Sequence, residues 1–310
     1  MARRTLAVLA LAALSSTSAL VAQERAFSLD GLVVTTSPTP RSADAISSNV
    51  TVLEGEDLRA AGLATVADAL RTVSGLAVVQ SGSFGAATSV FLRGGESDYV
   101  LVLLDDVQIN QPGGGFDFAA LTLWNVERIE IVRGPSSALH GSDAMAGVIH
   151  IITRAGHGPM TATLSTRLGS FGRRDWSAGA AGGTERTGYS ISLSRSRTDG
   201  ILAFNNRHDN TVASGRLSFL PDDRTRAGIS FRVGDREYHY PTDDAGNAVD
   251  RNAFTYGDET VLSASLRREF SSGFDVQARV GVADTDGGAD DAPDAASDTL
   301  GFFGFPSLDH

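Results

Sequence analysis

The stretch Ile129–Ile151, IEIVRGPSSALHGSDAMAGVIHI, places two apolar, β-branched runs around a middle section of Gly, Pro, Ser and Asp. The apolar runs are typical of strands, and Gly134-Pro135 stops the first one because proline fixes φ and lacks a backbone donor. The middle section also holds residues that cap short helical turns or permit a close approach of two backbones, namely Ser136, Ser142, Gly141 and Gly147. The pattern therefore predicts a strand, a tight helical excursion and a returning strand.

The composition excludes several classes of enzyme. The chain of 310 residues has no cysteine, which rules out disulfides, thiolate zinc sites and cysteine nucleophiles. All 26 residues counted as Lys+Arg are arginines, so a phosphate-loop lysine and a Schiff-base lysine are also excluded. There is no nucleophile elbow, and the six histidines lack metal-ligand spacing. We therefore expect no catalytic residues and no enzyme activity, and a net charge of −11 argues against nucleic-acid binding.

The N-terminus has the pattern of an export signal. Arg3 and Arg4 precede the nine apolar residues Leu6–Leu14, and small residues then allow cleavage after Ala22. Nine apolar residues are too few to span a bilayer as a helix. Residues 1–22 are thus predicted to be a signal peptide, and residues 23–48 an exposed, flexible tail. The tail contains one β-prone island, residues 32–35, ahead of two prolines.

Residues 49–156 mix helical and strand signals and are predicted to form a compact α+β domain. Thr65 and Asp68 form a capping-box pattern before three apolar residues that share one helical face, Val66, Leu70 and Val73. Four runs read as strands, at residues 76–80, 89–94, 99–106 and 126–132. Asp105 and Asp106 close one of these strands, and we interpret them as turn formers and not as an acid–base pair.

From Thr161 onward, strands alternate strictly between apolar and polar residues. The clearest examples are residues 189–197, 225–233 and 274–282. Short turns at about 183–187, 220–224 and 270–273 alternate with longer polar segments at about 198–210, 234–258 and 284–299, as in an outer-membrane barrel. Three arginines share the serine-rich face, and one arginine facing lipid at midplane would cost about 2–4 kcal/mol. They are Arg226, Arg232 and Arg279. The polar face is therefore predicted to face a lumen, with a soluble β-domain as the alternative.

Two long motifs resemble a known family. VERIEIVRGPSSALHGSDAMAGVIHIIT and FLRGGESDYVLVLLDDVQIN look like the end and the middle of the plug domain of TonB-dependent outer-membrane receptors, and DGLVVTTSP is similar to a TonB box with its flanks. The combination most resembles the cobalamin-type receptors. The sequence departs from the family pattern at Asp106, where Gly is usual, at His140, where Tyr is usual, and at His150, where Asn is usual.

The resemblance implies an α+β plug domain, residues 49–156, followed by part of a transmembrane antiparallel β-barrel, residues 157–310. The family barrel has 22 strands, and only seven or eight can be counted here, so we expect an N-terminal fragment of a transporter. An open sheet edge cannot persist in hydrocarbon, which makes a complete small barrel the weaker alternative. The resemblance also implies export to the Gram-negative outer membrane, contact with its lipid, and a partner, TonB, with the ExbB/ExbD energy complex.

The same resemblance supplies candidate site residues. The periplasmic tail would bind TonB through Leu32, Val33, Val34 and Thr35. Two Gly-rich loops would form the ligand-binding apex of the plug, with candidates Ser81, Ser83, Phe84, Asn110, Gln111 and Phe116. Cobalamin-type receptors carry calcium in their outer loops, and the acidic loop here offers Asp243, Asp244 and Asp250. Their spacing does not match a complete calcium loop, so we interpret them as a solvated loop and expect no cofactor besides this candidate calcium.

Three functions remain open. The resemblance favours TonB-dependent uptake of a scarce ligand, cobalamin, with ferric siderophore uptake as the alternative. A surface β-protein that binds a partner without transport is the alternative from another class. The TonB box discriminates between these classes, because a pure binding module has no use for one.

Overall fold

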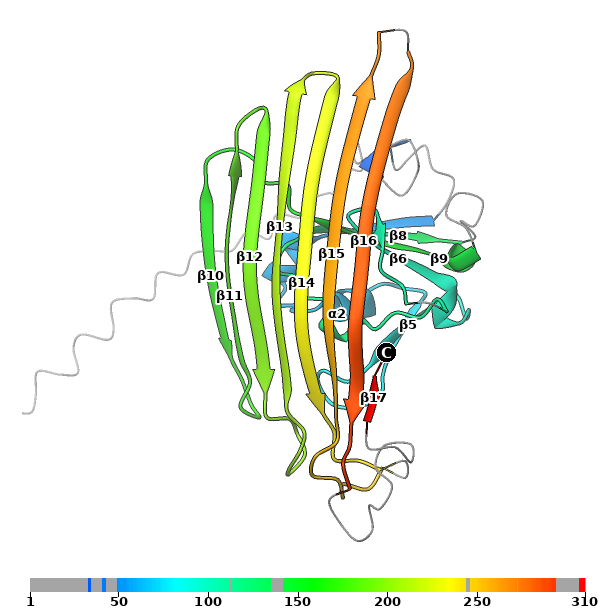
Figure 1. Cartoon of the computed structure of the whole chain (residues 1–310), viewed down its shortest axis with the longest axis vertical. Helices are drawn as coiled ribbons and strands as arrows, with labels where there is room; N and C mark the ends of the chain where they lie inside the picture. The colour runs from blue at the N-terminus through cyan, green and yellow to red at the C-terminus, as the bar shows by residue number, and fades with distance from the viewer. Residues whose placement is uncertain are drawn as a thin grey trace, which may run out of the picture.

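The computed structural model describes residues 33–34, 41–42, 49–111, 113–134, 142–243, 246–271, 273–293 and 307–309. It contains an α+β unit that lies against one face of a long, curved sheet (Figure 1). We call the unit from Asn49 to Thr153 the plug and the long sheet the wall. The signal-peptide prediction and His140 fall outside the described residues.

The plug is built around a five-stranded sheet with the order β3-β8-β9-β6-β7. Its strands are β3 (Asn49–Glu54), β6 (Val100–Leu104), β7 (Val107–Gln108), β8 (Val126–Arg133) and β9 (Gly147–Thr153). The pair β6–β9 is parallel and the other pairs are antiparallel. A separate hairpin joins β4 (Leu76–Gln80) to β5 (Thr88–Leu92). The four strands expected in this region are therefore present.

Short helices cover the plug sheet and complete its core. They are α1 (Gly55–Ala60) and α2 (Val66–Arg71), with 3-10 turns η2 (Ser97–Tyr99), η3 (Phe118–Ala120) and η4 (Ser142–Ala144). Thr65 and Asp68 form the predicted capping box, which satisfies two backbone donors at the start of α2. The apolar face that follows is buried in the plug core at Val66, Leu70 and Val73. No helix among the described residues is long and apolar enough to cross a membrane.

The opening stretch forms the predicted pair of strands. β8 and β9 are antiparallel, with Ile131 opposite Ile149, and both of these side chains are fully buried. Gly147 lies so close to Val132 that an added Cβ would meet its carbonyl oxygen at 2.3 Å, so glycine is required for this approach. The returning part of the excursion contains η4, in which Ser142 is a helical residue. Residues 135–141, including the candidate cap Ser136, lie outside the described part of the chain.

Asp105 and Asp106 form a two-residue hairpin turn between β6 and β7, with Leu104 paired to Val107. Both aspartates have positive φ, 47° and 71°. This geometry is that of the type I′ turn, whose twist matches the flanking strands and which Asp and Gly tolerate best. The prediction of turn formers is confirmed.

The wall is an eight-stranded antiparallel meander in which β10 to β17 pair in chain order. Its strands are β10 (Thr161–Leu168), β11 (Arg174–Gly183), β12 (Thr187–Thr198), β13 (His208–Asp222), β14 (Thr225–His239), β15 (Phe254–Glu269), β16 (Asp275–Asp290) and β17 (Ser307–Asp309). Among these described strands, β10 and β17 do not pair with one another, so the sheet is not closed.

The wall has inverted polarity. On β12, Ser190, Ser192 and Ser194 are buried against the plug, whereas the intervening Ile191 is 58% exposed and Leu193 is 41% exposed. The same inversion holds on β14, where Ser230 and Arg232 are buried and Ile229, Phe231 and Val233 are exposed. A water-soluble sheet would bury its apolar face. The polar face is therefore turned toward the plug, as predicted for a lumen-facing surface, and the apolar face looks outward.

The connections alternate in length, but the strands run further than expected. The turns 184–186, 223–224 and 270–274 lie at one end of the wall, and the longer connections 199–207 and 240–253 lie at the other (Figure 1). The predicted long segments at 234–258 and 284–299 are wrong at their edges, because β14 continues to His239 and β16 to Asp290. The strands stay paired where their side chains become polar, because the backbone hydrogen bonds between strands do not require apolar side chains.

Candidate ligand-binding loops and plug–wall contacts

The first Gly-rich loop of the plug, residues 81–87, lies against the end of the wall that carries the long connections. The Ser83 hydroxyl is 3.2 Å from the Tyr238 hydroxyl on β14, and it accepts a hydrogen bond of 2.9 Å from the Asn206 side chain. Ser81 is exposed, and its backbone N–H donates to the Ala87 carbonyl. The loop is therefore fastened to this end of the wall through Ser83, whereas Ser81 is open to solvent.

Phe84 anchors the same loop through its ring. The ring packs edge-on against His208 with centroids 5.5 Å apart, and the Arg173 guanidinium lies 4.1 Å from its centroid. Gly85 has φ +96° and lies so close to the imidazole of His208 that an added Cβ would be 2.3 Å from it. These contacts tie the apex loop to β13 and to the connection between β10 and β11.

The second candidate loop, residues 110–117, divides into structural and accessible residues. Asn110 accepts from the Val102 N–H and donates to the Val100 and Gly114 carbonyls, so its side chain holds the loop together. Phe116 packs edge-on against the buried Phe118, with ring centroids 4.9 Å apart. Gln111 is exposed. Gln111 is therefore the most open of the three, and Phe116, although half-buried, lines a cavity together with it.

Asp117, which sequence reasoning missed, is the residue that connects the two loops. Its carboxylate accepts from the Thr88 N–H at 2.8 Å and from the Ala119 N–H at 2.9 Å, and it forms an ion pair with Arg236 on β14. The residue comes two positions after the Gly113–Gly115 run, and a capping Asp before a short helical turn was the available signal.

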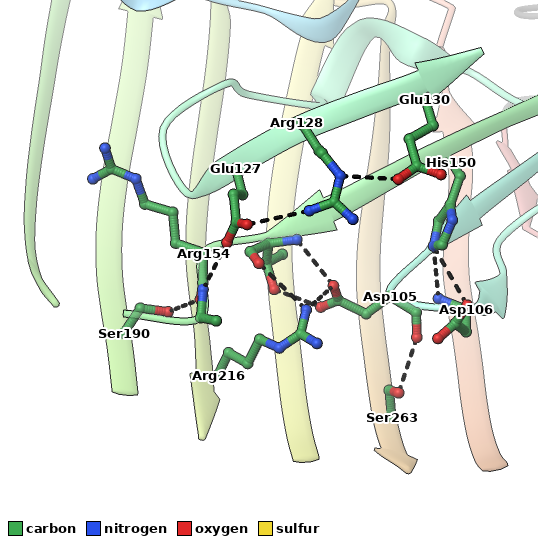
Figure 2. A network of polar contacts seen from close by, with 12 residues as sticks. Asp105, Asp106, Glu127, Arg128, Glu130, His150, Arg154, Ser190, Arg216 and Ser263 are labelled. Atoms are coloured by element: carbon green, nitrogen blue, oxygen red, sulfur yellow. Dashed lines mark hydrogen bonds and ion pairs between the residues drawn. The ribbon is translucent and has the colours of Figure 1, made fainter. Parts of the chain in front are cut away.

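Below the apex, Asp105 is the main polar link between plug and wall (Figure 2). Its carboxylate accepts from the Thr153 N–H at 2.9 Å and hydroxyl at 2.6 Å, and the Arg216 guanidinium of β13 donates to it at 2.9 Å. Its carbonyl accepts from the Ser263 hydroxyl of β15. A buried carboxylate needs such partners, because an unpaired one would be strongly destabilising.

Asp106 continues this link toward β16 and toward a buried histidine. Its backbone N–H donates to His150 Nε2 at 3.2 Å, and its carboxylate lies 3.4 Å from the Arg279 guanidinium. Burial lowers the pKa of His150 to about 4, although the nearby carboxylates of Asp106 and Asp105 act in the opposite direction. His150 is therefore neutral near pH 7, which agrees with a ring nitrogen that accepts a hydrogen bond.

Residues 42–148 match the family model of the TonB-dependent Receptor Plug Domain. Vitamin B12 transporter BtuB of Vibrio vulnificus is 34% identical over 173 residues, which cover 56% of this chain and 28% of that protein. Vitamin B12 transporter BtuB of Photobacterium profundum is 34% identical over 203 residues, which cover 65% of this chain and 33% of that protein. Together these matches support a TonB-dependent receptor fragment, with its plug domain over residues 42–148.

Solved structures agree in fold. A mutant of the ferric enterobactin receptor PfeA of Pseudomonas aeruginosa, in complex with enterobactin, aligns with a TM-score of 0.64 and 18% identity, over 84% of this chain and 44% of that chain. The alcaligin outer membrane receptor FauA of Bordetella pertussis aligns with a TM-score of 0.67 and 17% identity, over 83% of this chain and 42% of that chain. The present receptor chain spans about a third or less of the length of the curated relatives given above.

The predicted TonB-binding segment of this receptor is described only at its centre. Val33 and Val34 form strand β1 and pair antiparallel with β2 (Arg41–Ser42). Leu32 and Thr35 lie outside the described residues. Val33 and Val34 are thus extended, as their composition predicts, and their backbone forms strand pairs.

The calcium candidates of the receptor are engaged within their own loop. The Asp243 carboxylate accepts from the Asn247 backbone and side chain, at 2.7 and 3.0 Å. The buried Asp250 carboxylate accepts from the Asn252 and Ala253 N–H groups at 2.9 and 2.6 Å. Asp244 is outside the described residues, and no group of three or more acidic or histidine side chains within the described ranges could hold a metal ion. These two carboxylates close the turn, and they do not converge on a cation site.

Proposed function

We propose that this receptor takes up a scarce ligand across the outer membrane with energy from TonB, and that the ligand is cobalamin. Uptake is supported by the inverted wall, whose polar face packs against a plug. Ser83 and Phe84 fasten the plug loop 81–87 to the end of the wall that carries the long connections. A protein that only binds a partner does not need a plug inside a lumen. The curated Vitamin B12 transporters support the choice of cobalamin.

Energy would enter through the tail. Val33 and Val34 form a short strand, and a strand of TonB can add to its free edge or displace β2, because both would use the same backbone groups. Tension on the tail would then loosen the plug. The ExbB/ExbD complex would energise TonB, and the outward apolar side chains of the wall would contact membrane lipid.

Uptake of labelled cyanocobalamin by cells that depend on this receptor tests the proposal. We expect uptake that requires both the receptor and TonB. Surface binding of cobalamin without accumulation, in cells with an active TonB system, would favour the surface-binding class instead.

Ferric siderophore uptake is the second candidate. Its support is the fold likeness to the ferric enterobactin receptor PfeA, and likeness at 18% identity concerns the fold alone. The same cells should therefore be tested with a labelled ferric catecholate. Tight binding and uptake of the iron chelate, without affinity for any corrinoid, would replace cobalamin as the ligand.

A further inference from the structure

Between the plug and strands β10–β12 lie two adjoining cavities, of about 130 Å³ and about 20 Å³. Trp124 lines both of them. The larger cavity is also lined by Arg59 and Arg167, and the smaller one by Asn125 and Arg154. We call these two cavities together the seam. Neither cavity includes the apex candidates Ser81, Ser83, Asn110, Gln111 or Phe116, although Phe84 reaches the larger one.

Arg59 brings a half-buried positive charge to the seam without an opposing carboxylate. Its Nη1 donates to the Leu123 and Val126 carbonyls at 2.9 and 2.7 Å, and no ion pair involves it among the described residues. Burial is the main cause that lowers the pKa of Arg59 to about 10, and the positive charge of Arg154 acts in the same direction. Glu56 acts in the opposite direction, without forming an ion pair with Arg59 among the described residues. A bound anion would therefore stabilise this partly desolvated guanidinium.

Arg154 and Asn125 add further donors. The backbone of Arg154 is held at both ends, by the Asn125 carbonyl and the Ser190 hydroxyl, whereas its guanidinium makes no hydrogen bond or ion pair in the described part of the chain. In Figure 2 this guanidinium points away from the network around Asp105. Asn125 is 7% exposed, and its buried Nδ2 has no acceptor among the described residues. A buried donor without an acceptor is costly, so the site is incomplete as it stands.

The acids around the seam are already engaged. Asp175 is the one carboxylate among the residues that line it, and Arg173 and Ser196 donate to it at 2.8 and 2.7 Å. Glu127 beside Arg154 accepts from Arg128 and from the Ala155 N–H. Arg167 donates to the Gly62 carbonyl and forms no ion pair within the described ranges. Among the described residues, the seam therefore offers guanidinium and amide donors with no unpaired carboxylate to neutralise them.

We propose that the seam binds an oxyanion, a phosphate or carboxylate group, between the plug and the wall. Guanidinium forks recognise both groups through paired N–H donors, and Asn125 Nδ2 supplies the additional neutral donor. The source of this oxyanion is the transported ligand, whose anionic group the seam holds after the ligand leaves the apex. This last step rests on the proposed function, whereas binding of the oxyanion does not.

Titration of the purified receptor with inorganic phosphate tests the site directly. Trp124 is the reporter because it lines both cavities, and a Trp124→Phe variant identifies its part of the fluorescence signal. We expect phosphate to change its fluorescence, and Arg154→Gln to weaken this binding by about tenfold or more, the usual effect of losing one charge-assisted contact. Arg154→Lys should restore part of it. Arg226→Gln is the matched control, because it removes one exposed positive charge from the wall outside the seam.

The possible outcomes test the oxyanion site and the proposed transport function separately. No response to phosphate, or equal affinity in Arg154→Gln and Arg226→Gln, overturns the oxyanion site. Normal ligand uptake by Arg154→Gln despite lost phosphate binding keeps the site and overturns the ligand as its source. Phosphate binding in a receptor that transports neither cobalamin nor a ferric chelate leaves the site standing and contradicts the proposed function.

Discussion

At the scale of single residues, Asp105 has three tasks, and its position in a turn reveals only the first. It adopts positive φ in the hairpin, it binds the N–H and hydroxyl of Thr153, and it receives Arg216 from the wall. The plug is therefore fastened to β13 by the same residue that reverses its own chain. Removing the charge acts on plug stability and on plug–wall contact together.

We predict that Asp105→Asn lowers the free energy of unfolding of the plug by about 2 kcal/mol, because an amide keeps one hydrogen bond to Thr153 and loses the ion pair with Arg216. Hydrogen exchange of β6 and β9 amides in the purified receptor measures the change. Asp223→Asn, at an exposed aspartate in the 223–224 turn, is the control and should have no effect. Equal exchange in both variants would contradict a structural role for the Asp105 charge.

His150 should make plug stability depend on pH. Burial lowers the pKa of His150 to about 4, from an ordinary value near 6.5. As the pH falls from 6.5 to 4, His150 therefore binds a proton in the unfolded chain and stays neutral in the folded plug. Stability is therefore full above about pH 6.5, and it decreases by about 3 kcal/mol as the pH approaches 4. Thermal unfolding of wild type and His150→Asn between pH 7 and 4 measures it. Parallel curves for the two proteins would show that His150 does not titrate in this way.

At the scale of elements, the outward face of β12 should tolerate no charge. Ile191 is 58% exposed on this face, and its neighbours in sequence, Ser190 and Ser192, are buried. We predict that Ile191→Arg costs about 2–4 kcal/mol, the penalty for arginine facing lipid at midplane, and reduces the amount of folded receptor in outer membranes. Heat-modifiable mobility on gels reports folding. Glu185→Arg, in the exposed 184–186 turn, should fold normally, and equal yields of both variants would argue against a lipid-facing wall.

Strand β1 should act through its backbone. Val33→Pro removes one donor and fixes φ, so we expect it to abolish uptake, whereas Val33→Ala keeps the backbone groups and should be tolerated. Ligand binding at the cell surface should survive both changes. Uptake and surface binding are measured side by side. Transport by the proline variant at the wild-type rate would show that this segment is only a linker.

At the scale of the whole molecule, transport requires the plug to move relative to the wall. Residues 1–310 contain no cysteine, and the two single-cysteine variants show whether a cross-link needs both introduced thiols. Ser83 and Asn206 are joined by a hydrogen bond between plug and wall, and a short reducible cross-linker between cysteines at both positions should block uptake while leaving surface binding intact. Reduction should restore uptake. Full uptake in the cross-linked receptor, confirmed by mass spectrometry, would mean that the apex loop stays in place during transport.

The sequence alone determined the elements that depend on local patterns. Alternation with period two marked β12, β14 and β16 and assigned their polar faces to the lumen, because adjacent side chains of a strand point to opposite faces. The Thr65 capping box and the paired aspartates marked a helix start and a turn for the same local reason. The plug motifs identified the family through a resemblance, which no periodicity could supply.

Only the tertiary structure decided which residues meet across the plug–wall boundary. Nothing in the sequence distinguished Asn110 and Phe116 from Gln111, yet packing turns their side chains into the plug. His208, Tyr238 and Arg173 gave no signal, because their partners in the apex loop lie far away along the chain. Arg154 and Arg59 likewise gave no signal in the sequence, because the wall residues that line the seam with them lie far away along the chain. The neighbours of a side chain at the plug–wall boundary depend on how the two units dock. Docking depends on many contacts between residues far apart in the chain, and local sequence patterns do not encode those contacts.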